Sequence, residues 1–104
     1  MIYLDDVDKY KDWSLQMKTE LKREQLWDIV EGTDEPPEVE NDDPAFMAWS
    51  HKNAKALGVI MRDCLNEFYD AIRRIRSAKI VWDTLAAICA LPKSKLHRYL
   101  YISL

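Results

Sequence analysis

Glycine and cysteine are scarce in this chain, and it holds no long apolar run. Its 104 residues include two glycines and two cysteines, so few residues suit tight hairpins or phosphate-cradling loops, and neither GxxxxGKS/T nor GxGxxG occurs. Cys64 and Cys89 form no CxxC pair, which predicts reduced thiols in an intracellular protein. No apolar run approaches the roughly 20 residues that span a membrane, and the acidic start "MIYLDDVDKY" does not resemble a signal peptide. We therefore expect a cytoplasmic protein that does not enter a membrane.

Catalytic and metal-binding patterns are missing as well. His51 and His97 have no cysteine or aspartate placed to complete a triad, and the polar stretch "SHKN" around His51 favours a surface histidine. The two widely separated cysteines, without an HxxxH pair, do not have the spacing of zinc ligands. We therefore expect a protein that is not an enzyme and that has no catalytic residue, cofactor or metal site.

The residues that are abundant indicate a helical protein with a core of its own. Hydrophobic residues make up 48% of the chain and include four tryptophans, which is too apolar for a disordered protein. Apolar residues recur at spacings of three and four, and each tryptophan falls on the apolar side of its segment. This position favours a shared core over an exposed aromatic cage. The expected core residues are Trp13, Met17, Leu21, Leu26, Trp27, Val30, Trp49, Leu57, Ile60, Trp82 and Leu85.

Helix-capping and helix-breaking residues divide the chain into segments. The spacing predicts a first helix over residues 8–25 and a short second one that Gly32 ends. The pair Asp43-Pro44 is typical of a helix start, a break is expected near Asn66, and Ser77 is expected to cap the helix that carries the last tryptophan. We predict one all-α domain over residues 1–104, a compact bundle of five or six short helices.

The stretch "EGTDEPPEVENDD", residues 31–43, is called the acidic loop here because it holds seven acidic residues and two adjacent prolines. It has little apolar surface to bury and its prolines interrupt a helix, so it is predicted to be a solvated loop. Two interpretations are open. A charged connector is favoured, and a docking strip for a basic partner is the alternative.

A basic cluster and the apolar end of the chain are the candidate contact surfaces. The cluster consists of Arg73, Arg74, Arg76 and Lys79. RNA binding by it is a weak hypothesis, because the net charge is −3 and no recognition motif occurs. The cluster can instead meet the acidic loop, either within one molecule or from a neighbour, and the second case predicts salt-sensitive self-association.

The last segment, "KSKLHRYLYISL", is predicted to be a final helix. For its apolar residues, packing back onto the core is the favoured interpretation, and an exposed handle for another copy or a partner is the alternative. These candidate interface residues are Leu96, Tyr99, Leu100, Tyr101, Ile102 and Leu104.

Four stretches in this order resemble a known family: "YKDWSLQMKTELKREQLWDIVEG", the proline-acidic "TDEPPEVENDD", "AWSHKNAKALGVI" and "SAKIVWDTLA". They are similar to the amino-terminal Gag region of Ty1/copia-type long-terminal-repeat retrotransposons, in the version common in plant genomes. The resemblance covers about residues 8–86, and residues 87–104 diverge from it. Its most specific parts are Trp13 with Met17, the run from Leu26 to Gly32, and the run from Ala78 to Leu85.

The resemblance implies a helical domain like the amino-terminal domain of a capsid protein, which assembles with copies of itself to package the element's RNA. The sequence departs from a full Gag because it has no CCHC zinc knuckle and no second half of a capsid. The expected function is therefore a non-enzymatic, self-associating Gag-derived module. The alternative is a domesticated Gag fragment that docks on a host protein or interferes with the assembly of a related Gag.

Overall fold

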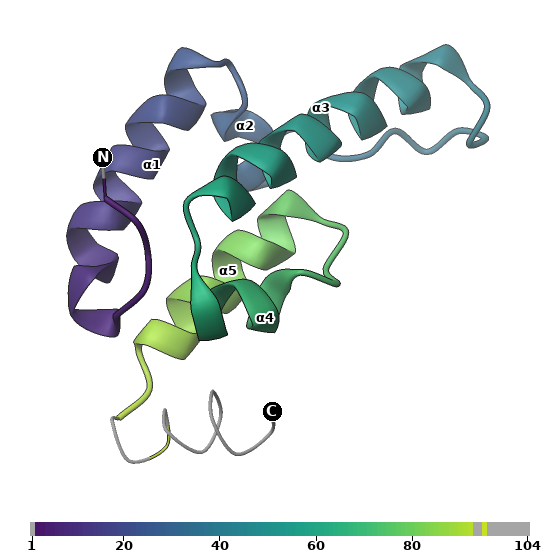
Figure 1. The fold of residues 1–104 in the computed structure, drawn as a ribbon. Coiled ribbons are helices and arrows are strands. Elements are labelled where there is room, and N and C mark those ends of the chain that lie inside the picture. The colour runs from purple at the N-terminus through teal and green to yellow at the C-terminus, as the bar shows by residue number, and fades with distance from the viewer. Residues whose placement is uncertain (1, 93–94, 96–104) are drawn as a thin grey trace.

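The computed structural model describes residues 2–92 and 95, which form five α-helices and one short 3-10 helix (Figure 1). The elements in chain order are η1 (Val7–Lys9), α1 (Tyr10–Arg23), α2 (Trp27–Glu31), α3 (Pro44–Arg62), α4 (Asn66–Ile72) and α5 (Ala78–Cys89). Over these residues the extended pairing is limited to an isolated bridge between Leu4 and Cys64. The prediction of an all-α protein with five or six helices is thus confirmed. The predicted final helix and the six apolar residues from Leu96 onward lie outside the described residues.

Local chemistry sets the helix ends. The Asp43 side chain accepts a hydrogen bond from the Ala45 amide (2.8 Å) at the start of α3. The Ser77 hydroxyl accepts one from the Ile80 amide (3.2 Å) at the start of α5. Each of these bonds satisfies an amide that the first turn of a helix leaves without a partner. Gly32 ends α2 with φ 100°, a left-handed conformation that glycine adopts without strain. The predicted roles of these three residues are confirmed.

One predicted boundary differs from the structure and another is confirmed. A first helix is predicted over residues 8–25, but η1 precedes it and α1 ends at Arg23, where the chain turns through Gln25 at φ 60°. The break predicted near Asn66 is confirmed, because α3 ends at Arg62 and α4 begins at Asn66, whose φ is 54°. The first helix ends early because Gln25 adopts a left-handed conformation, which hydrophobic spacing does not register.

Apolar residues from every α-helix and from the amino-terminal segment form one core. Seven of the expected core residues are buried: Trp13, Met17, Leu21, Leu26, Val30, Ile60 and Leu85. The other four, Trp27, Trp49, Leu57 and Trp82, are half-buried and pack against this core rather than lying inside it. The sequence analysis did not identify Leu4, Ile29 and Ile88, which are also buried.

Three of the four tryptophans contact one another. The ring of Trp82 on α5 stacks on that of Trp13 on α1, with centroids 5.8 Å apart, and the edge of Trp27 meets Trp82 at 5.3 Å. Trp49 makes its ring contact with Phe46 instead, at 6.1 Å. One core shared by all four tryptophans was expected. Instead, Trp13, Trp27 and Trp82 form a trio that joins α1, α2 and α5, and Trp49 lies on the flank of the core.

The amino-terminal segment is held by the turn that follows α3. The Leu4 amide and the Trp13 indole N–H both donate to the backbone carbonyl of Asp63, at 2.7 and 3.2 Å. The Leu65 amide donates in turn to the carbonyl of Leu4 (3.0 Å). Buried backbone groups need such partners, so this exchange allows Leu4 to be buried without a sheet.

Candidate interaction surface

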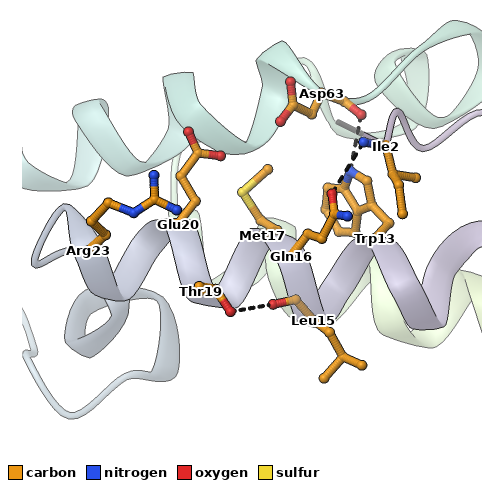
Figure 2. Close-up of a pocket in the computed structure, with 9 residues that line it drawn as sticks. All are labelled: Ile2, Trp13, Leu15, Gln16, Met17, Thr19, Glu20, Arg23 and Asp63. Carbon is orange, nitrogen blue, oxygen red and sulfur yellow. Dashed lines mark hydrogen bonds between the residues drawn. The ribbon is translucent and has the colours of Figure 1, made fainter.

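A groove of about 370 Å³ lies along α1, between this helix, the amino-terminal segment and the end of α3 (Figure 2). We call it the α1 groove. The buried side chains of Trp13 and Met17 form its apolar floor, and Leu15, which is 59% exposed, lies on the same helix at its edge. Glu20 and Arg23 add charged groups to its lining. An apolar floor with a charged border suits an apolar side chain that carries polar neighbours.

The carboxylates of this groove are already engaged. The Arg62 guanidinium donates to both oxygens of Glu20 (2.7 and 2.9 Å) and, through Nε, to Oδ1 of Asp63 (3.0 Å). These hydrogen bonds raise the pKa of Arg62 further above its ordinary value; the bond to Asp63 has the largest effect, and the bonds to Glu20 have the next largest. The positive charge of Arg62 therefore holds both carboxylates in ion pairs.

The two thiols are poorly suited to nucleophilic chemistry. Burial raises the pKa of Cys64 to about 12 and that of Cys89 to about 11, so both remain protonated at neutral pH.

Across residues 2–92 and 95, no group of three histidine, cysteine, aspartate or glutamate side chains is placed to hold a metal ion. In the same part of the chain, no helix combines the length and apolar character needed to cross a membrane.

The acidic loop is tied down at its beginning and exposed after that point. The Trp49 indole N–H donates to the carbonyl of Asp34 (3.0 Å), and the Lys52 ammonium pairs with the Asp34 carboxylate (2.9 Å). Glu35, Glu38, Glu40 and Asp42 have exposed side chains. The loop is therefore anchored to α3 while it presents negative charge to solvent, an arrangement that fits both interpretations of it.

The structure brings the four basic residues together where α4 leads into α5, and it pairs two of them. Arg73 lies 3.8 Å from Asp70, and Lys79 pairs with Asp83 at 2.6 Å. The side chains of Arg74 and Arg76 are exposed. Asn53 of α3 fixes the turn, because its amide donates to the Arg76 carbonyl (2.8 Å) and its oxygen accepts from the Ala78 amide (2.9 Å).

Exposed apolar side chains identify two further places that the sequence analysis missed. Met47 on α3 is 59% exposed and Ile80 on α5 is 54% exposed. Both lie off the buried stripe of an amphipathic helix, and a residue-by-residue helical wheel reveals such positions. Scattered exposed apolar residues are common on protein surfaces. Apolar residues that form a contiguous patch rimmed by polar residues are better candidates for contact with a partner.

Comparison with known proteins gives one family. The model of the gag-polypeptide of LTR copia-type matches residues 17–100. The match begins and ends later than the expected 8–86, and it includes part of the segment that the sequence analysis described as divergent. Searches of curated proteins and of solved structures each gave no match.

Proposed function

Because this chain belongs to the gag-polypeptide family of LTR copia-type elements, we propose that it is a non-enzymatic helical module that self-associates in the manner of a capsid protein. The observation that carries the proposal is that its apolar residues are divided between a buried core and exposed positions on the surface. Large apolar side chains from all five α-helices close one core, while Leu15, Met47 and Ile80 remain exposed on three different helices. Assembly beyond a two-fold dimer needs a rigid body with contact surfaces on more than one side.

The charge distribution supports the same function. The acidic loop and the basic residues near the start of α5 give one chain two surfaces of opposite sign. Such surfaces attract each other between copies and fix the orientation in which copies meet. The proposal includes a cytoplasmic location, with which the two unpaired thiols, Cys64 and Cys89, agree.

The test is absolute mass by light scattering after size exclusion, over about a hundredfold range of concentration and at two salt concentrations. We expect a mass that rises above that of the monomer with concentration and falls again as salt screens the charged surfaces. A mass that stays at the monomer value over the whole range contradicts self-association.

The alternative function is that of a domesticated fragment that docks on a host protein or on a related Gag and interferes with its assembly. The α1 groove supports it, because the groove combines a buried apolar floor with Glu20 and Arg23. We expect Leu15→Lys to abolish capture of an intact copia-type Gag by this chain, whereas Met47→Lys leaves capture unchanged. Equal capture by both variants and the unsubstituted chain contradicts docking at this groove.

A further inference from the structure

The first half of α3 projects from the body of the molecule together with the acidic loop (Figure 1). On this part of the chain lies an open groove of about 370 Å³, lined by Asn41, Phe46, Met47, Ser50, His51 and Ala54, which we call the α3 groove. The acidic side chains of Glu40 and Asp42 flank Asn41 in the sequence and are exposed. The surface is thus an apolar hollow with negative charge beside it.

The place where α4 leads into α5 has the opposite character. Its exposed residues include Arg73, Arg74, Arg76 and Ile80, and we call these four the basic turn. The amino-terminal end of α5 lies in the same turn and adds the positive end of a helix dipole. The basic turn therefore presents an apolar side chain with positive charge beside it. It complements the α3 groove in shape, because the side chain can enter the hollow, and in the sign of its charge.

A single molecule cannot bring these two surfaces together. Asn53, on the buried stripe of α3, holds the basic turn of its own chain through the Arg76 carbonyl and the Ala78 amide. With 3.6 residues to a helical turn, Met47, His51 and Ala54 lie on the far side of α3 from this stripe. A basic turn seated in the α3 groove therefore belongs to another molecule.

We propose that the α3 groove receives the basic turn of a second copy of this chain, with Ile80 seated beside Met47 and the arginines facing the acidic loop. This inference rests on the proposed self-association and specifies its geometry. The contact is heterologous, because the basic turn of one copy meets a different surface, the α3 groove, on the next copy. Repetition of such a contact builds a ring or a filament rather than a closed two-fold dimer.

Each contact is small and charged, which determines how the assembly behaves. A stable pairwise interface buries about 800 Å² on each partner, and these surfaces are short segments of one helix and one turn. We therefore expect weak individual contacts, growth in mass only at high protein concentration, and weaker association at high salt than at low salt.

The test uses one variant of each surface. Met47→Lys places a positive charge in the α3 groove opposite the arginines. Ile80→Asp places a negative charge on the basic turn opposite the acidic loop, and an acidic residue three positions after the cap Ser77 suits the first turn of a helix. The control is Tyr3→Lys, since Tyr3 is 46% exposed in the amino-terminal segment and belongs neither to these two surfaces nor to the α1 groove.

We expect Met47→Lys and Ile80→Asp each to remain monomeric where the unsubstituted chain and Tyr3→Lys associate. Mixed in equal amounts, the two blocked variants are expected to form a dimer that does not grow further, because each retains one working surface. Association of either blocked variant at the unsubstituted level, or a mixture that stays monomeric, overturns this inference and leaves self-association standing. An unsubstituted chain that never associates overturns the proposed function as well.

A second pair of variants keeps the test independent of the apolar substitutions and their effect on the fold. Glu40→Lys with Asp42→Lys reverses the charge of the two residues that flank Asn41, and Arg74→Glu with Arg76→Glu reverses the charge of two arginines of the basic turn, all at exposed positions. Each reversed chain is expected to lose association by itself and to regain it when mixed with the other. Failure of the mixture to associate overturns the pairing of these two surfaces.

Discussion

Replacing Asn53 by alanine tests how α3 positions the start of α5. Asn53 is 8% exposed, and its side chain makes two hydrogen bonds. It donates to the Arg76 carbonyl (2.8 Å) and accepts from the Ala78 amide (2.9 Å). Ala78 is fully buried, so its N–H has no access to water once the asparagine oxygen is gone. Arg76 is exposed, and its carbonyl can take a water molecule instead.

The magnitude follows from these two losses. An orphaned buried amide costs about 1–3 kcal/mol, and the loss of one ordinary hydrogen bond costs about 0.5–1.5 kcal/mol. We therefore expect Asn53→Ala to lower the free energy of unfolding by about 2–4 kcal/mol, out of the roughly 5–15 kcal/mol that is typical of a domain.

The assay is urea unfolding followed by circular dichroism at equilibrium. The midpoint is expected to fall with little change in the dependence on urea, because the surface exposed on unfolding stays nearly the same. Asn41→Ala is the control, since Asn41 is exposed in the acidic loop and its loss should change stability by less than about 0.5 kcal/mol. A change of that small size for Asn53→Ala would refute the reasoning that the side chain fastens the turn.

Three other predictions concern stability and reactivity. Trp13→Phe removes the indole hydrogen bond to the Asp63 carbonyl and part of a buried ring, so thermal unfolding should reveal a loss of about 1–3 kcal/mol; a neutral result means that the indole N–H carries no stability. Burial raises the pKa of Cys64 from 9.0 to about 12, so stability should be fully present below about pH 9 and decline as the pH rises towards 12; alkylation that is as fast in the folded chain as in urea contradicts this. Gly32→Ala forces a side chain into φ 100° with its Cβ 2.6 Å from Cε of Lys79, and it should cost about 1–3 kcal/mol in a urea titration. Adding Lys79→Ala should recover only the steric part of that loss, whereas full recovery shows that the backbone conformation carries no strain.

Features that depend on neighbouring residues can be predicted from the sequence. Asp43 and Ser77 cap helices because a short polar side chain can reach the amides of the next turn, whatever the rest of the molecule does. Gly32 ends α2 for an equally local reason. The spacing of Trp13, Met17 and Leu21 likewise identifies one face of α1, because a helix brings every third or fourth residue to the same side.

Contacts between groups that are distant in the sequence depend on how the helices pack. Leu4 is buried because its backbone pairs with residues 63 and 65, and nothing in the local sequence around Leu4 specifies that partner. Arg62 holds Glu20 because α1 and α3 pack together. Helical spacing assigns Met47 to an outward position, but the groove around it exists because the acidic loop returns beside α3. Contacts of this kind depend on the packing of whole elements, which residue spacing along one helix cannot specify.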